Sequence, residues 1–450
     1  MKYQALASAA ITASARSRYI FGAIIIAGIT FIFAQFNAYL PWIRYTLSRG
    51  GTGMGSVKSY FFSINLNGMT LKELQAKTSF SQDEILALAP QLPSSLLLPF
   101  HEIPLIRWDE ASGTGRIEAL RRNRPDEWFY ACHFLGDPVM PGCWGIDALW
   151  QCLIFFAAWR GLKGCGKPLG MENVSFFGQI RPYDGTIRCA VDVLSCETSE
   201  GETLLGGKGA VEVDGMPVYS AGQVQVGTGF WQSDGAKAPA IVRRPAPPLT
   251  QQLSYEEFRA KTGFSPAEIL AVSQGALVKD CPVELGLLPS SLMLEIGEVH
   301  EIRRDPALGT GRIIASRRVD ASDWFYPMNH GVKPTALSID AVWQLMGLFL
   351  AWSGNAGTGR ALGFEQVEVF DEIKPGDREL IYDVGVLKLV HAGNGDAFIN
   401  ADARVFADGR PILNCVNVRV GCHRGIRYSD YPIKNEMALG GKIKIFRPSA

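Results

Sequence analysis

The chain has 450 residues, and at roughly 150 residues per domain this length excludes a single small module. Lysine plus arginine and aspartate plus glutamate number 44 each, so the sequence lacks the overall basic excess typical of nucleic-acid-binding proteins. With 47% hydrophobic and 20% charged residues, the composition is that of a folded protein with a sizeable core and excludes a disordered one.

The nine cysteines are odd in number and contain no CxxC pair, which fits neither a disulfide framework nor a zinc site. We therefore expect reduced thiols, a cytoplasmic location and no bound metal.

An N-terminal extension, residues 1–68, differs from the rest of the chain. Residues 19–43 carry no charged side chain, and this run exceeds the roughly 20 residues that cross a bilayer. It is therefore a candidate transmembrane anchor that would associate the protein with a membrane. The Ala/Ser-rich stretch before it also fits a targeting peptide, and a true start at Met54 or Met69 is a third alternative. The sequence leaves these three interpretations open.

An internal repeat follows the extension. The segment LKELQAKTSFSQDEILALA, residues 71–89, recurs as YEEFRAKTGFSPAEILAVS, residues 255–273. Further on, LPSSLLL, GTGRI and WFY return 196 residues later as LPSSLML, GTGRI and WFY, whereas GIDALWQ returns as SIDAVWQ after 193 residues. The second copy is therefore three residues shorter just before its SIDAVWQ segment.

The repeat predicts two similar domains, residues 69–230 and 253–430. Residues 231–252 are rich in proline and read as a semi-rigid linker, and residues 431–450 form a C-terminal tail.

Each copy has the same expected order of elements. An amphipathic helix capped by Ser81 or Ser265 comes first, then short alternating strands, then a long apolar helix that covers about residues 142–159 in the first copy. Further strands alternate around the Asp-Gly pairs at 214–215 and 408–409, which is a strong hairpin signal. A helix wrapped by an antiparallel sheet is the hotdog arrangement. We therefore expect an α+β double hotdog, a pseudo-dimer within one chain that either stays monomeric or assembles further.

The segment FYACHFLGDPVMPGCWGIDALWQ, residues 129–151, closely resembles the signature of FabA-type β-hydroxyacyl-(acyl carrier protein) dehydratase/isomerases. The resemblance extends over about residues 75–425, and the tandem form is similar to the dehydratase domains of polyunsaturated fatty acid synthases. It implies a 3-hydroxyacyl-thioester dehydratase whose substrate is carried by acyl carrier protein, in fatty acid, polyunsaturated fatty acid or polyketide synthesis. An accompanying trans-2/cis-3 isomerase activity is left open.

Water elimination from a 3-hydroxyacyl thioester needs a base for the C2 proton and an acid for the departing C3 hydroxyl. Histidine can be the base near neutral pH, and a carboxyl group in an apolar tunnel can be the acid. In the family the two groups come from opposite hotdogs, so the resemblance pairs His133 with Asp340 and leaves Asp147 for a second site.

The developing enolate oxygen needs hydrogen-bond donors, which backbone amides at the start of the buried helix can supply. We expect this oxyanion and substrate-binding site around Val139, Gly142 and Cys143. Water elimination transfers no electrons to a carrier, and no nucleotide loop occurs, so we expect no cofactor.

The second copy departs from the signature at one decisive place. Asn329 stands where the first copy has His133, and His330 comes one residue later. The loop that follows reads GVKPTALS instead of GDPVMPGCWG. We therefore expect one intact composite site, His133 with Asp340, and one degenerate site around Asp147.

Two arginine pairs, Arg121 with Arg122 and Arg317 with Arg318, recur after the GTGRI segments. They could attract an acidic carrier protein, and the alternative interpretation is a solvated strand end.

Two other functions compete with the dehydratase. A hotdog thioesterase would use a carboxylate to activate water, and a non-catalytic acyl-binding subunit would have lost both sites.

Overall fold

The structure is a computed structural model that describes residues 70–94, 97–134, 137–243, 249, 251–283, 285–424, 438–439 and 442–443. These residues belong to one compact unit, Ile64–Ala450. The expected extension 1–68, with its candidate anchor 19–43, lies outside the described residues. So does most of the tail 431–450, apart from the short strands β14 (Ala438–Leu439) and β15 (Lys442–Ile443).

The two sequence repeats fold into the same succession of elements. The first copy contains α3 (Leu71–Ala76), β1 (Phe80–Ser81), α4 (Gln82–Leu88), β2 (Glu102–Asp109), β3 (Thr114–Arg122), the 3-10 helix η1 (Trp128–Ala131), α5 (Gly142–Arg160), β4 (Lys167–Phe176), β5 (Thr186–Ser199), β6 (Glu202–Val213) and β7 (Met216–Gly227). The second copy contains α6 (Tyr255–Ala260), α7 (Pro266–Ser273), η2 (Ser291–Met293), β8 (Glu298–Asp305), β9 (Thr310–Arg318), α8 (Thr335–Trp352), β10 (Thr358–Val369), β11 (Glu379–His391), β12 (Ala397–Ala407) and β13 (Arg410–His423).

Each copy wraps a sheet around one long helix, as the hotdog prediction requires. The helix α5 packs on β5, β6 and β7, and α8 packs on β11, β12 and β13. Both helices are apolar on almost every side, as suits helices that a sheet or a neighbouring helix covers. In the most apolar stretch of 18 residues of each helix, 83% is buried. Their length and composition would also suit a membrane span, but this burial is that of core helices. The double hotdog prediction is confirmed.

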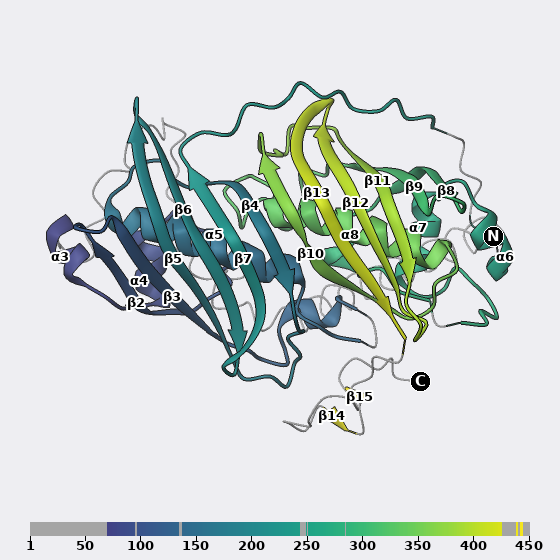
Figure 1. Ribbon diagram of the computed structural model, residues 1–450, viewed down its shortest axis with the longest axis horizontal. Helices are drawn as coiled ribbons and strands as arrows, with labels where there is room; N and C mark the ends of the chain where they lie inside the picture. Colours follow the sequence, from purple (N-terminus) through teal and green to yellow (C-terminus); the bar gives the residue numbers. More distant parts are fainter. Residues whose placement is uncertain are drawn as a thin grey trace, which may run out of the picture. The chain divides into compact units, whose positions relative to one another are not determined.

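The two copies share one continuous antiparallel sheet. Its strand order is β1-β2-β3-β5-β6-β7-β4-β10-β13-β12-β11-β9-β8, and the copies join where β4 pairs with β10, for example at Val174 and Phe364 (Figure 1). The helices α5 and α8 also contact each other across this junction. The start of each central helix can therefore face residues of the other copy.

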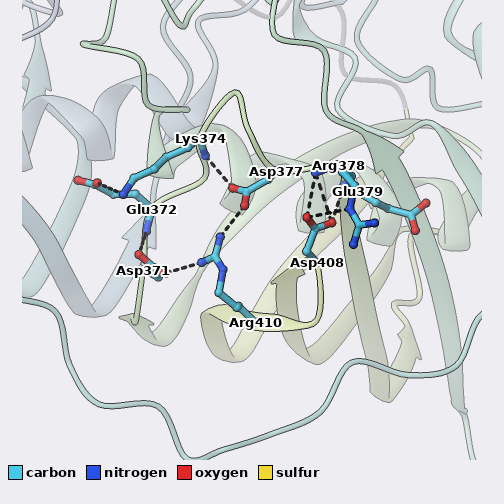
Figure 2. Close-up of polar contacts among 8 residues, drawn as sticks. All are labelled: Asp371, Glu372, Lys374, Asp377, Arg378, Glu379, Asp408 and Arg410. Carbon is cyan, nitrogen blue, oxygen red and sulfur yellow. Dashed lines mark hydrogen bonds and ion pairs between the residues drawn. The ribbon is translucent and has the colours of Figure 1, made fainter.

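The predicted hairpins form at both Asp-Gly pairs. Asp214 and Gly215 have φ of 49° and 78°, and Asp408 and Gly409 have φ of 48° and 85°, as a two-residue turn with positive φ requires. The aspartates have a second role. Asp214 accepts hydrogen bonds from the amides of Gly185 and Thr186, and Asp408 accepts them from the corresponding loop of the second copy (Figure 2).

The linker between the copies passes along the second half of the sheet (Figure 1). Its residues Ala236, Ala238 and Ile241 pack on an apolar cluster formed by Ile314, Ile381 and Phe406. The corresponding positions in the first copy are the charged residues Glu118, Arg188 and Glu212, which form ion pairs with one another. The linker thus covers a face of the second copy that is apolar, whereas the same face of the first copy is charged.

This contact predicts a measurable contribution of the linker to stability. Ile241→Asp should lower the free energy of unfolding by about 1–2 kcal/mol, because a charged group would replace apolar contact area. Val242→Asp is the matched control, since Val242 is 69% exposed. Urea unfolding of both variants checks the prediction, and equal effects of the two substitutions would contradict it.

Candidate active site

His133 follows the 3-10 helix η1 and is buried, with 7% of its surface exposed. Its Nδ1 lies 3.0 Å from the carbonyl oxygen of Val139. A carbonyl oxygen only accepts, so Nδ1 carries the proton and Nε2 keeps its lone pair. Burial, together with the nearby positive charge of Arg360, lowers the pKa of His133 to about 4. The ring is therefore a neutral base at physiological pH.

Asp340 lies in α8 of the second copy and is 4% exposed. Burial raises the pKa of its carboxyl group to about 7, so a large share of the molecules carry a proton there near neutral pH. Gln344, one helical turn later, donates from Nε2 to Asp340 Oδ2 over 2.7 Å. Gln344 is itself fixed, because Nε2 also donates to the carbonyl of Met293 and Oε1 accepts from the amide of Glu295.

One pocket brings His133 and Asp340 together. Both residues line it, with Val139 and Gly142 from the first copy and Gly359 from the second. A neutral imidazole and a protonatable carboxyl group thus face one cavity from opposite halves of the chain.

The start of α5 forms another part of this pocket. The first amides of a helix have no acceptor within it, so those of Gly142 and Cys143 are available to a ligand. Gly142 is needed there for space, since a Cβ atom would lie 2.8 Å from the ring of Phe176. Val139 differs from the expectation. Its amide already donates to the carbonyl of His133 over 2.8 Å, so Val139 orients the histidine and is not an oxyanion donor.

An ion-pair network from both halves holds the loop after His133. Asp137 accepts from Arg181 Nη1 at 2.8 Å and from Arg360 Nη2 at 2.5 Å. Arg181 is 1% exposed, and Arg360 also donates to Gln179 at 2.7 Å. A buried, multiply paired arginine of this kind fixes geometry more than a surface pair does.

The network predicts an effect on the histidine. Arg360→Met should raise the pKa of His133, because a positive charge that disfavours the imidazolium ion is removed. An NMR titration of the histidine ring measures this shift without any substrate. Arg312→Met is a control that removes an arginine paired with Asp383. A pKa of His133 that stays the same in Arg360→Met would contradict the prediction.

Residues of both copies form a different pocket around Asp147. Asp147, Gln151, Asn329 and His330 line it. Burial raises the pKa of Asp147 to about 7, as for Asp340, and Gln151 donates to its Oδ2. The base is missing. Asn329 takes the place of His133, since its Nδ2 donates to the carbonyl of Val332 over 3.0 Å as the histidine does to Val139.

His330 differs from His133 in its surroundings. Its Nε2 donates to the carbonyl oxygen of Leu92 over 2.7 Å, and the residue is exposed, whereas His133 is buried. The residue also has a φ of 55°, because the shortened loop turns sharply there. No residue of this loop corresponds to Asp137, and the counterpart of Arg181 is Lys374, whose side chain is 60% exposed.

The loop beside this second pocket has its own set of ion pairs. Arg410 bridges Asp371 and Asp377, and Asp408 accepts from the amides of Arg378 and Glu379 (Figure 2). Glu372 of the same loop lines the pocket.

Two of the four arginines that we expected to bind a carrier protein are largely buried and already paired. Arg121 is 4% exposed and pairs with Glu127, and it also donates to the carbonyl of Leu98. The side chain of Arg317 is 18% exposed and binds Asp323 through both terminal nitrogens. These two residues stabilise the fold, which corrects the expectation for them.

Arg122 and Arg318 do reach the surface. In the described ranges, no group of three or more His, Cys, Asp or Glu side chains is placed to hold a metal ion.

Sequence reasoning missed Arg360, Arg181 and the buried ion pair between Lys333 and Glu295, whose charged atoms are 2.7 Å apart. A signal for the network existed, because Asp137 has no counterpart in the second copy and Lys374 stands there in place of Arg181. None marked Arg360, which lies far from the signature segment.

Comparison with known proteins agrees with this architecture. The family model described as "FabA-like domain" matches residues 92–222 and 288–415. Among solved structures, the chain is similar to a dehydratase domain from the CurJ module of the curacin polyketide synthase. The identity is 13%, the TM-score is 0.43, and the match covers 72% of this chain and 97% of that one. A dehydratase domain from the terminal module of the rifamycin polyketide synthase has 11% identity and a TM-score of 0.41, with 74% and 98% of the two chains covered.

Proposed function

Because the chain belongs to the family of FabA-like domains, we propose that it is a 3-hydroxyacyl-thioester dehydratase with one working site. The observation that carries the proposal is the pocket that His133 and Asp340 share across the two halves. A neutral base and a protonated acid are the two groups that water elimination needs, and burial favours the neutral form of both.

The arrangement of the pocket supports the following reaction. His133 Nε2 takes the proton from C2, and the electron pair moves into the thioester carbonyl to give an enolate oxygen. The amides of Gly142 and Cys143 stabilise this oxygen with the positive end of the α5 dipole. The C3–O bond then breaks, and Asp340 gives its proton to the leaving hydroxyl so that water departs. A proton passes from the imidazolium to the aspartate to restore the starting state.

We propose acyl carrier protein as the partner that delivers the thioester, with Arg122 and Arg318 as the remaining exposed arginines near the strand ends. The pathway is fatty acid, polyunsaturated fatty acid or polyketide synthesis. Isomerisation of the product from trans-2 to cis-3 would use the same base and acid on C4 and C2.

One assay separates the proposal from its alternatives. The purified chain is incubated with a 3-hydroxyacyl carrier protein, and the acyl group is identified by mass spectrometry. An enoyl product that has lost the mass of one water molecule supports the dehydratase. Release of the free acid would indicate a thioesterase, and an unchanged acyl group would indicate a binding subunit.

The two pKa shifts also predict the pH dependence. His133 must be neutral, so kcat/KM should rise as the pH passes upward through about 4. Asp340 must be protonated, so kcat/KM should fall as the pH passes through about 7. Measurement of kcat/KM with a short-chain 3-hydroxyacyl thioester between about pH 4 and 9 would show both the rise and the fall. A rate that keeps rising well above neutral pH would contradict the role of Asp340 as the acid.

A further inference from the structure

The pocket around Asp147 has kept most features of a thioester site. Its carboxyl group and Gln151 repeat the arrangement of Asp340 and Gln344. Thr335, the first residue of α8, lines it as Gly142 lines the first pocket. The first amides of α8 lack acceptors within the helix, and Pro334 precedes them without a capping side chain.

The pocket is also larger and easier to reach than its counterpart. Its volume is about 280 Å³, whereas that of the His133 pocket is about 90 Å³. Asp147 is only half-buried, although Asp340 is 4% exposed. The loop after Asn329 is three residues shorter than the loop after His133.

Two buried polar groups in this pocket lack a hydrogen-bond partner among the described residues. One is the acceptor Gln151 Oε1, in a side chain 4% exposed, and the other is the donor Trp144 Nε1, in a side chain 2% exposed. The orphaned acceptor has a structural cause. Gln344 Oε1 accepts from the amide of Glu295, but the residue at that place in the first copy is Pro99, which has no N–H.

An unpaired buried donor and acceptor are costly unless a ligand or water satisfies them. A 3-hydroxyacyl thioester offers the complement, since its hydroxyl group donates and its carbonyl oxygen accepts. The carbonyl would meet the first amides of α8, and the hydroxyl beside Asp147 would donate to Gln151 Oε1 and accept from Trp144 Nε1. The residue at the position of the base cannot act as one, because the amide nitrogen of Asn329 donates to Val332 and its carboxamide cannot take a proton from C2.

We infer that the Asp147 pocket is a second acyl-thioester site that binds a 3-hydroxyacyl group without eliminating water from it. The inference rests on the proposed function for the identity of the ligand. One chain then holds two acyl groups, one that reacts at His133 and one that is retained.

The test is isothermal titration calorimetry of the full chain with a 3-hydroxyacyl-pantetheine in which an amide replaces the thioester. The wild type should bind two equivalents. Asp147→Leu and its repeat counterpart Asp340→Leu should each bind one equivalent. An otherwise identical acyl-pantetheine amide without the 3-hydroxyl group should bind to the Asp147 pocket about fivefold to tenfold more weakly than the hydroxylated one, because one buried hydrogen bond is lost.

A wild type that binds one equivalent or none, or an Asp147→Leu variant that still binds two, would overturn the inference. If thermal unfolding shows that Asp147→Leu is not folded, Asn329→Trp replaces it, since an indole ring would fill the same pocket from the other copy. Turnover of the true thioester separates this test from the proposed function. If the chain binds two equivalents of the analogue but forms no enoyl product, the second binding site stands and the dehydratase proposal is refuted. If it forms the enoyl product but binds one equivalent, the dehydratase proposal stands and the second binding site is refuted.

Discussion

His133→Ala is expected to lower kcat/KM for water elimination by about 10³-fold, because general-base catalysis of the C2 proton transfer is lost. Asp340→Asn should cause a loss of similar size, since the amide cannot protonate the leaving hydroxyl. The two groups act on one C2–C3 unit, so the double variant should be little worse than either single one. Initial rates with a 3-hydroxyacyl thioester measure all three.

Folding must be shown to be intact in these variants. Asp340→Asn does not leave an unpaired partner, because the new carboxamide keeps a side-chain oxygen to which Gln344 can still donate. We therefore expect an unchanged thermal unfolding temperature for Asp340→Asn. Losses that multiply in the double variant would contradict a shared site.

Separating the two halves is expected to abolish the activity. Fragments 69–230 and 253–430 would each carry one partner of the pocket, His133 or Asp340. Each would also expose the strand that now pairs at the junction, β4 or β10, and an exposed strand edge favours aggregation. Expression of the fragments alone and together, followed by the dehydration assay, measures the effect.

The matched control for this experiment is a chain cleaved only in the linker, for instance by a protease site placed after Gly235. The halves are then made together and can fold on each other. We expect this nicked protein to keep its activity. Full activity of fragment 69–230 by itself would refute the pairing of residues across the halves.

Most of the fold could be predicted because the chain carries it twice. The Asp-Gly pairs at 214–215 and 408–409 determine both hairpins through their positive φ, and the apolar run after Gly142 predicts a helix that is buried on all sides. The linker was predicted as a spacer only. Its packing on Ile381 and Phe406 depends on which strands lie side by side, which local sequence does not specify.

The site was predictable where a residue type is tied to a chemical role. The signature placed His133, and the repeat placed Asp340 and the substitution at Asn329. The contacts of Arg121 and Arg360 were not predictable. Arg121 lies at the end of a strand, as a surface residue would, yet Glu127 and the carbonyl of Leu98 enclose it. Arg360 reaches Asp137 only because the sheet continues from β4 to β10.

Two matched substitutions test whether His133 and Asp340, from opposite halves of the chain, form the catalytic pair. Asp340→Asn and Asp147→Asn change the same position of the two repeats, and the rate of enoyl formation is measured for both under identical conditions. We expect a loss of about 10³-fold for Asp340→Asn and no more than about twofold for Asp147→Asn. Equal losses, or a larger loss for Asp147→Asn, would contradict it.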